Sequence, residues 1–273
     1  MASPTSSNGH VHLHIEDSGG SGRPIVLIHG WPLSAEAWKE QVGPLRDAGY
    51  RVIAYDRRGF GRSGKPASGY DYDTLTADTA RILEDLDLRE VTLVGFSMGG
   101  GEVARYVGRH GEDRLRSIVF ASAVPPYMMK TDDNPDGPLT PDKAKAMEDA
   151  LRADRDGFFD QFTKDFFSSD GELKVTETQR QDAIALCKQS DQIAALGCME
   201  AFGTTDFRGD LKKVTVPTLV LHGGVDGIVP FEGSGLRTLE AIPGSRKSVI
   251  AGAPHGCNSS HPDEWNKALL AFL

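Results

Sequence analysis

The stretch Val91-Thr92-Leu93-Val94-Gly95-Phe96-Ser97-Met98-Gly99 joins a short apolar run to a long amphipathic segment. This pattern predicts a strand, a tight turn and a helix, with Ser97 at the apex of the turn. Glycines two residues before and after the serine allow the chain to turn sharply, so that the hydroxyl stands above the helix N-terminus. A bare G-x-S-x-G also occurs by chance in surface turns. The strand before it and the helix after it favour a nucleophile here.

Five further apolar runs predict additional strands, and segments with a helical pattern lie between them. Runs rich in Val and Ile that lack polar alternation suit parallel strands buried on both faces. Strand alternating with helix predicts an α/β protein with a doubly wound, mostly parallel sheet, whose active groups lie at the carboxyl ends of the strands. The predicted strands are 25–28, 51–55, 91–94, 117–121, 218–221 and 247–251, and the predicted helices are 34–47, 73–86, 98–109, 232–241 and 263–272.

The alternation stops between residues 124 and 211, where helical patterns continue without a convincing strand. We therefore predict an α/β core of residues 1–123 and 212–273 and an inserted helical cap of residues 124–211. Phenylalanines in the cap repeat at helical spacing and concentrate on one face. They are Phe158, Phe159, Phe162, Phe166 and Phe167.

The phenylalanine face of the cap has two interpretations. It either only packs on the core or also lines a pocket, because ligand sites are largely apolar and aromatic. The residues that we predict to line the substrate pocket are Pro32, Val124, Phe162 and Ile228.

A serine hydroxyl is a poor nucleophile unless a base accepts its proton and a third group holds that base. His255 is the predicted base, because it lies in the loop after the last strand. Asp226 is the predicted acid, because it comes directly after the strand at 218–221. The rival residues are better placed for structural roles, at strand ends, at a helix start or before the strand. They are His29, His222 and His261 for the base, and Asp206 and Asp210 for the acid.

The oxyanion of an acyl intermediate needs backbone N–H donors, one after the nucleophile and one in the loop after an early strand. Met98 and Trp31 occupy these positions. Gly30 allows the tight turn, and Pro32 has no N–H to donate. The run Gly99-Gly100-Gly101 is costly inside a helix, so we expect this helix to approach neighbouring strands or a substrate closely.

The composition narrows the class of protein. The 273 residues carry a formal net charge of -9, from 30 Lys and Arg against 39 Asp and Glu. Because the basic residues are scattered among acids, we expect no nucleic-acid partner. Three cysteines without metal-ligand spacing suggest neither a disulfide framework nor a zinc site. With no apolar run of about 20 residues and no leader pattern, we expect a cytoplasmic protein without membrane contact.

Two motifs that suggest a nucleotide site or a metal site have simpler structural explanations. The run 59–64 matches G-x-G-x-x-G, but loop residues rather than a helix follow it, so a dinucleotide site is not expected. His10, His12 and His14 alternate with apolar residues, which an exposed face of an edge strand explains without a metal. We therefore expect neither a metal nor another cofactor.

Several segments resemble the α/β-hydrolase superfamily and, within it, the cofactor-free haloperoxidase group of esterases and perhydrolases. Besides 95–99, the segments that carry the resemblance are 29–34, 56–63, 99–106 and 131–137. The resemblance implies a catalytic triad of Ser97, Asp226 and His255, in the chain order of that superfamily. It also implies that Trp31 and Met98 form the oxyanion hole.

The resemblance further implies that hydrogen peroxide can replace water in attacking the acyl-enzyme, which gives a peracid that oxidises halide. Proline after the oxyanion tryptophan, here Pro32, is the version associated with better perhydrolysis. One departure concerns the segment 256–261, which is more polar than expected after the catalytic histidine and leaves the pocket shape there open.

The sequence therefore predicts a serine carboxylesterase for small acyl esters, with perhydrolase or cofactor-free chloroperoxidase activity as a side reaction. An amidase or lactamase with the same triad is the nearest alternative, because the sequence does not fix the leaving group. A non-catalytic binding or signalling protein on a hydrolase scaffold is the alternative of a different class. A homo-oligomer is compatible with the sequence, which does not fix the oligomeric state.

Overall fold

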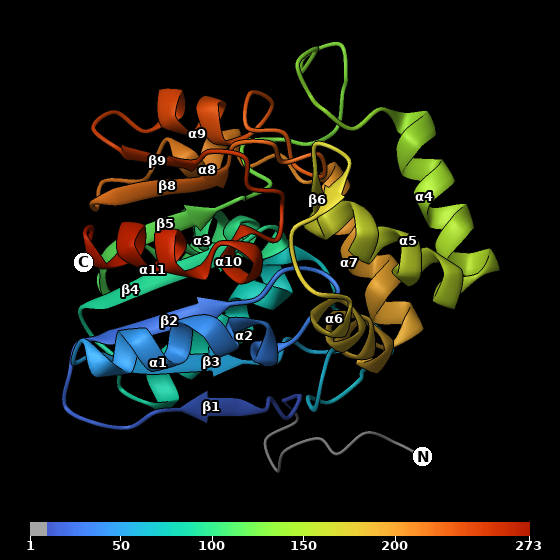
Figure 1. Cartoon of the computed structure of the whole chain (residues 1–273). Helices are drawn as coiled ribbons and strands as arrows, with labels where there is room; N and C mark the ends of the chain where they lie inside the picture. The colour runs from blue at the N-terminus through green and yellow to red at the C-terminus, as the bar shows by residue number, and fades with distance from the viewer. Residues whose placement is uncertain (1–9) are drawn as a thin grey trace.

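The computed structural model describes residues 10–273, and its main feature is a seven-stranded sheet (Figure 1). Neighbouring strands pair in parallel except at one edge, where β1 runs antiparallel to β3. In spatial order the strands are β1 (Ile15–Asp17), β3 (Arg51–Tyr55), β2 (Pro24–Ile28), β4 (Val91–Phe96), β5 (Leu115–Ala121), β8 (Thr218–Gly223) and β9 (Arg246–Ile250). The predicted α/β fold with a mostly parallel sheet is confirmed.

Helices cover both faces of this sheet. On one face α1 (Lys39–Asp47) packs on α11 (Pro262–Leu270), and the short α10 (Cys257–Ser260) lies beside them. On the other face α2 (Tyr72–Asp85) packs on α3 (Met98–His110), followed by α8 (Arg208–Leu211) and α9 (Gly235–Ala241). This double covering explains why the central strands are almost continuously apolar.

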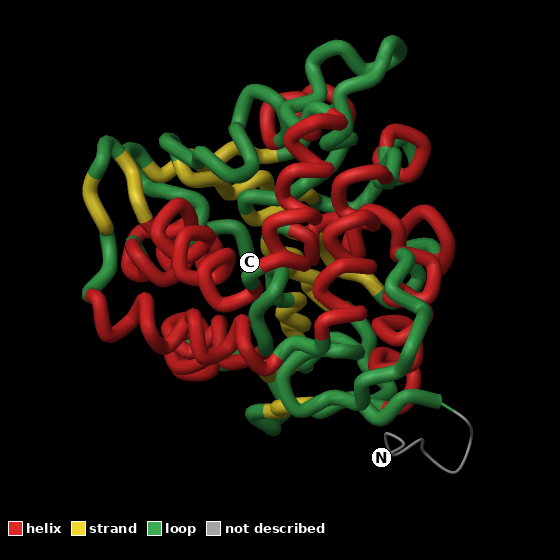
Figure 2. The backbone as a smooth tube through the Cα atoms, turned by 90° about the vertical axis from the view of Figure 1, so that its right-hand side faces the viewer, coloured by secondary structure: helices red, strands yellow, loops and turns green. Residues whose placement is uncertain are grey.

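Four of the helices between β5 and β8 in the chain stand over the carboxyl ends of the strands (Figure 2). They are α4 (Pro141–Ala153), α5 (Arg155–Phe167), α6 (Glu177–Gln189) and α7 (Gln192–Thr204). Each begins at a side chain that accepts a hydrogen bond from a backbone N–H of its first turn, which is the usual reason for a helix to start. These caps are Thr140, Asp154, Thr176 and Asp191.

Local differences from the sequence predictions have physical causes. The edge strand begins only at Ile15. Before it, the backbone carbonyls of His12 and His14 accept hydrogen bonds from the N–H groups of Gly64 and Asp56 instead of forming a regular strand pair. The helix predicted at 34–47 begins as a 3-10 turn, Ala35–Trp38, before α1. A short pair of strands, β6 (Ser168–Ser169) and β7 (Glu172–Leu173), interrupts the segment in which no strand was expected.

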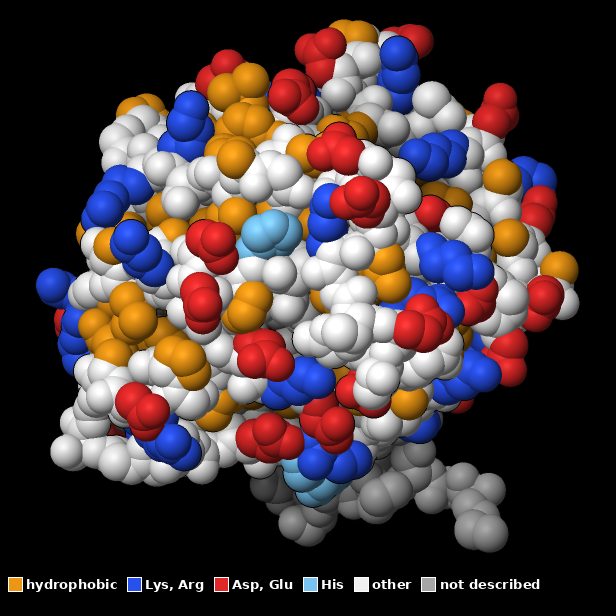
Figure 3. Space-filling view, viewed as in Figure 1, with side chains coloured by type: hydrophobic (Ala, Val, Ile, Leu, Met, Phe, Trp, Pro, Cys, Tyr) orange, Lys and Arg blue, Asp and Glu red, His pale blue; other side chains and the backbone are white. Residues whose placement is uncertain are grey.

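Two further features concern the distribution of charged side chains on the surface and the length of the apolar helices. Acidic and basic side chains are interspersed over the face that Figure 3 shows. None of the helices formed by residues 10–273 is both long and apolar enough to cross a membrane.

Helix α3 lies unusually close to its neighbours, as the three consecutive glycines predict. A Cβ atom at Gly99 would stand 2.5 Å from the carbonyl oxygen of Ile28, and one at Gly100 would stand 2.3 Å from the Cβ of Ala123. At Gly101 the obstacle is the Tyr72 ring, at 2.6 Å. The glycines are therefore needed because any side chain would push the helix away from β2, from the chain after β5 and from α2.

We expect Gly100→Ala to lower the free energy of unfolding by about 1–3 kcal/mol, because an added methyl group overpacks the contact with Ala123. Gly209→Ala is a matched control, since its Cβ would meet nothing within 4 Å on a helix of ordinary backbone. This control should be neutral or slightly stabilising. Urea denaturation of both variants checks the difference, and equal midpoints would contradict the packing argument.

Candidate active site

Ser97 joins β4 to α3 in a backbone conformation that few residues other than glycine adopt. Its φ is 55° and its ψ is -118°, which costs on the order of 1–3 kcal/mol and persists only where the surroundings enforce it. Here its N–H donates to the carbonyl of Ala121 at 2.8 Å, and its own carbonyl accepts from the N–H groups of Gly100 and Val124 at 3.0 and 3.2 Å. The serine is thereby held at the end of the sheet by three backbone hydrogen bonds.

The strand order places Ser97 at the point where the chain stops adding strands on one side of β2 and begins adding them on the other. The chain passes from β2 outward to β3 and then returns across β2 to β4. Loops after β2 and β4 consequently diverge, and ligands of open α/β sheets bind in the crevice between them. Ser97 follows β4, and Trp31 follows β2.

Three side chains that are far apart in the sequence form one hydrogen-bonded chain. The Oγ of Ser97 lies 2.9 Å from Nε2 of His255, and Nδ1 of the same ring lies 2.7 Å from Oδ2 of Asp226. Because an ionised carboxylate only accepts, Nδ1 carries the proton and Nε2 is free to accept one from the serine. This is the arrangement of nucleophile, base and orienting acid.

The carboxylate of Asp226 is buried but remains ionised. Its Oδ1 accepts hydrogen bonds from the backbone N–H groups of Ile228 and Val229, at 2.9 and 2.8 Å. Burial alone would raise the pKa of Asp226, but the charge of His255 and the hydrogen bonds from His222 and His255 outweigh it, so the pKa lies below its ordinary value. At neutral pH the acid can therefore orient His255 and stabilise its charge.

The His255 ring is fixed by aromatic packing as well. Its centroid lies 5.1 Å from that of Phe96, just before the serine, and 5.0 Å from that of Phe166 on α5. The ring is almost wholly buried. Phe96 on β4 and Phe166 on α5 thus both pack on the His255 ring.

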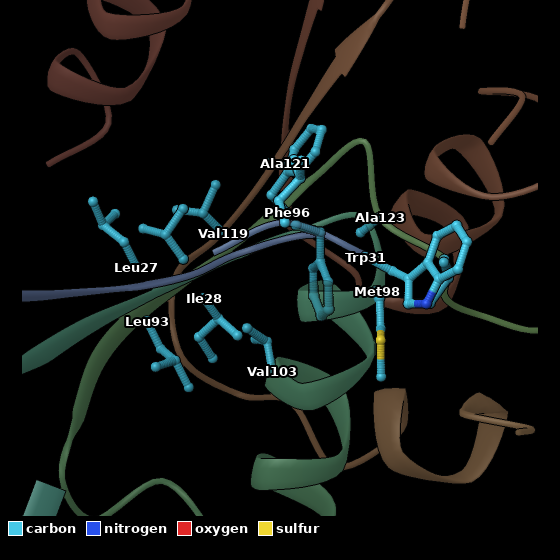
Figure 4. Packing of buried hydrophobic residues seen from close by; sticks show 14 of the residues in the cluster. Leu27, Ile28, Trp31, Leu93, Phe96, Met98, Val103, Val119, Ala121 and Ala123 are labelled. Carbon is cyan, nitrogen blue, oxygen red and sulfur yellow. The ribbon is translucent and has the colours of Figure 1, made fainter. Parts of the chain in front are cut away.

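Trp31 and Met98, the predicted oxyanion donors, flank the serine. A Cβ atom at Gly30 would stand 3.2 Å from that of Ser97, so the loop carrying Trp31 lies directly against Ser97. Met98 is the first residue of α3, where a helix leaves its N–H groups without acceptors inside the helix. Figure 4 shows both side chains beyond the packed strand residues Leu27 and Val119.

The Trp31 indole is anchored to the segment between β5 and β8. Its Nε1–H donates to the carbonyl of Ala195 at 2.9 Å. Its ring packs edge-on against Phe158, Phe162 and Phe202. The tryptophan therefore ties the loop after β2 to helices α5 and α7.

A cavity of about 260 Å³ opens at Ser97 between the sheet and helices α4, α5 and α7. Its wall is mainly apolar, and three exposed polar side chains, Lys143, Gln161 and Asp165, also line it. The apolar residues of the wall are Trp31, Val124, Met128, Pro138, Leu139, Met147, Phe158, Phe162, Phe202, Ile228 and Val229.

The predicted pocket residues have different positions in relation to this cavity. Val124, Phe162 and Ile228 line it, whereas Pro32 is buried and does not belong to its wall, where the neighbouring Trp31 lies instead. Of the other phenylalanines on α5, only Phe158 reaches the cavity.

Sequence reasoning missed several residues of the wall. Met128, Met147 and Phe202 come from the loop after β5 and from α4 and α7. Their convergence follows from how the helices pack, and no local spacing in the sequence marks it.

The chain matches the family model for the alpha/beta hydrolase fold over residues 23–262. The chain belongs to the α/β hydrolase family. It is 45% identical over 258 residues to a non-heme chloroperoxidase of Kitasatospora aureofaciens, with 93% of each chain covered. It is 36% identical over 281 residues to a bifunctional esterase/perhydrolase of Acinetobacter calcoaceticus, covering 100% of this chain and 99% of the relative.

A solved structure agrees with these relatives. A bromoperoxidase from Bacillus anthracis superposes with a TM-score of 0.94 at 50% sequence identity, covering 96% of this chain and 95% of that one. The predicted membership of the non-heme haloperoxidase and esterase/perhydrolase group is confirmed, and the chain is an enzyme of this family.

A buried ion pair beneath the site links α3 to the loop that carries Trp31. The Nε of Arg57 donates to Oε1 of Glu102 at 2.6 Å, and its Nη2 donates to the carbonyl of His29 at 2.6 Å. Tyr55 donates to the other oxygen of Glu102 at 3.2 Å. Glu102 belongs to α3 and His29 precedes Gly30-Trp31, so one guanidinium holds both sides of the crevice.

The rival histidines have structural partners. His29 lies in the Arg57 network, where burial lowers its pKa well below the ordinary value and keeps the ring neutral. Nε2 of His222 lies 2.8 Å from the carbonyl oxygen of Val229 and so supports the loop that carries Asp226. His261 bonds to neighbouring Ser260.

The rival aspartates are also engaged elsewhere, Asp206 with Arg208 and Asp210 with Arg105. Within residues 10–273 no three His, Cys, Asp or Glu side chains come together as a metal-binding group.

We expect Glu102→Gln to lower the free energy of unfolding by about 3–5 kcal/mol, because it leaves the buried Arg57 charge without a counter-charge. The loop before Trp31 should also lose its fixed position, so that kcat falls more than KM changes. Thermal unfolding and steady-state kinetics measure the two effects. Asp149→Asn, which removes an exposed helix pair with Lys145, is the control and should leave both unchanged. Equal behaviour of the two variants would refute the role of the buried pair.

Proposed function

We propose that the protein is a serine carboxylesterase for small, apolar acyl esters, with perhydrolysis as a side reaction. One observation carries the proposal, namely the unbroken hydrogen-bond chain from Ser97 through His255 to Asp226, which opens on an apolar cavity. A protein that only binds ligands has no need of this chain. The bifunctional esterase/perhydrolase relative supports the second activity.

In acylation, Oγ of Ser97 attacks the ester carbonyl while Nε2 of His255 accepts the hydroxyl proton. The carbonyl oxygen gains negative charge, which the N–H groups of Trp31 and Met98 stabilise. Asp226 keeps the imidazole in the required tautomer and stabilises its positive charge. The proton then passes from His255 to the departing alkoxide, which leaves as an alcohol.

In deacylation, water or hydrogen peroxide attacks the acyl carbon and gives its proton to His255. The bond to Oγ of Ser97 breaks, and the serine recovers the proton. Water yields the carboxylic acid, and hydrogen peroxide yields the peracid. The enzyme needs no cofactor for either step, because no electrons are exchanged with it.

The cavity argues for small acyl groups. Its volume of about 260 Å³ falls just below the roughly 300–1,000 Å³ of pockets for drug-sized ligands. The Phe162 and Phe158 rings on α5 and Phe202 on α7 close one side of it. We assign to the helices within 124–211 the role of a cap that supplies this wall and shields the acyl-enzyme.

Ser97→Ala and His255→Ala should each reduce kcat for 4-nitrophenyl acetate by roughly 10⁴-fold or more, because the two residues act as a unit. His261→Ala is the matched control and should keep wild-type kcat. Near-normal turnover by Ser97→Ala would rule out the assignment.

Labelling of wild type by a fluorophosphonate tests the alternative of a binding protein without catalysis. Comparison of turnover of the ester with that of the matching anilide tests the amidase alternative.

Phe162→Ala should shift acyl preference toward longer chains, because it removes a ring from the cavity wall. We expect the ratio of kcat/KM for hexanoate over acetate esters to rise about tenfold, since a methylene in an apolar pocket contributes roughly 1–3 kcal/mol. Phe272→Ala, which changes a ring packed near Arg246 outside the cavity, should leave the ratio unchanged. An unchanged ratio in Phe162→Ala would show that acyl groups bind elsewhere.

A further inference from the structure

Two methionines present their side chains to the cavity that contains the nucleophile. Met128 lies in the loop after β5 and Met147 lies on α4, and both line the cavity that opens at Ser97. Met128 is only 5% exposed. Within residues 10–273 these are the sulfur-containing side chains of that cavity wall.

The residue next in the chain faces a different space. Met129 is half-buried and lines a separate groove of about 500 Å³ between α4 and α7, which Ser97 does not reach. Met147 lies between the two spaces and lines both. Two adjacent methionines therefore face different spaces. Met128 lines the cavity that contains Ser97, and Met129 lines the separate groove between α4 and α7.

The cysteines do not compete for an oxidant in the cavity. Cys187, Cys198 and Cys257 are fully buried, and none lines the cavity. Burial raises the pKa of the Cys198 and Cys257 thiols to about 12, so they stay protonated and unreactive at neutral pH. A thioether reacts without losing a proton, so a methionine that the peroxy compound can reach is open to oxidation at neutral pH.

We propose that Met128 is a site of oxidative modification by the peracid that the enzyme itself forms. The inference rests on the proposed perhydrolysis. The peracid is released from Ser97 into a cavity whose wall includes Met128, before it reaches solvent. The thioether attacks the terminal peroxy oxygen, the O–O bond breaks, and a sulfur–oxygen bond forms. Sulfur loses two electrons, and the peracid, with its proton retained, becomes the carboxylic acid.

The modification alters the acyl site. A sulfoxide places a polar oxygen in a small apolar cavity, and a polar group buried without a partner is unfavourable. It also reduces the space available to the acyl group. Turnover with peroxide should therefore raise KM for apolar esters progressively, which makes perhydrolysis self-limiting while hydrolysis with water is not.

The test compares Met128 with Met129 in the same enzyme. Wild type and Ser97→Ala are incubated with 4-nitrophenyl acetate and hydrogen peroxide, with peroxide alone, or with added peracetic acid. Peracid formation is measured separately by halide oxidation. Tandem mass spectrometry then locates sulfoxide at each of the two methionines. A parallel reaction contains excess dimethyl sulfide, which removes peracid from bulk solvent.

During turnover by wild type we expect sulfoxide at Met128 to exceed that at Met129 at least fivefold and to persist with dimethyl sulfide. Added peracetic acid should reverse the order, because Met129 is the more accessible residue. Met128→Leu should lose activity at least threefold more slowly than wild type, each measured against its own starting rate, whereas Met129→Leu should not.

Three outcomes overturn the proposal, and they are distinguishable. If peracid forms but Met129 is oxidised as fast as Met128, the modification site is wrong while perhydrolysis stands. If the halide assay detects no peracid, the side reaction itself fails, and the modification fails with it. Equal oxidation of Met128 in Ser97→Ala and wild type would also refute self-modification.

Discussion

The structure depends on how closely α3 approaches the sheet. Gly99 and Gly100 let the helix lie against Ile28 and Ala123 without intervening side chains. That approach forces the chain to turn between β4 and α3 within a single residue, and Ser97 takes the unfavourable conformation that results. Ser97 is therefore placed by backbone packing, and its position does not rely on its own side-chain contacts.

The charges beneath the site follow from the same geometry. Glu102 lies on α3 and meets Arg57, just after β3, in the protein interior. An unpaired charge there would be strongly unfavourable, so the pair and the carbonyl of His29 fix one another. Asp226 is ionised in an equally buried place because backbone N–H groups and His255 compensate its charge.

The cavity wall comes from other parts of the fold than the hydrogen-bonded side chains of Ser97, His255 and Asp226. Its wall is assembled from the loop after β5 and from helices α4, α5 and α7, which start at their own side-chain caps. Trp31 connects the two parts, since its indole packs on α5 and α7 while its backbone flanks the nucleophile. Changes in the helical segment can thus alter the cavity wall without moving Ser97, and Met128 lines the same cavity as Ser97.

The sequence by itself determined the alternation of buried strands and helices, the tight turn at Ser97 and the order in which Asp226 and His255 follow it. These features depend on local patterns: apolar runs, glycine spacing and position after a strand. It could not determine that Pro32 is absent from the cavity wall, that the backbone carbonyls of His12 and His14 accept hydrogen bonds from Gly64 and Asp56, or that Met128 and Phe202 share a cavity. Those facts were decided by tertiary structure, because they arise where separate elements pack against one another, and no spacing along the chain encodes that distance.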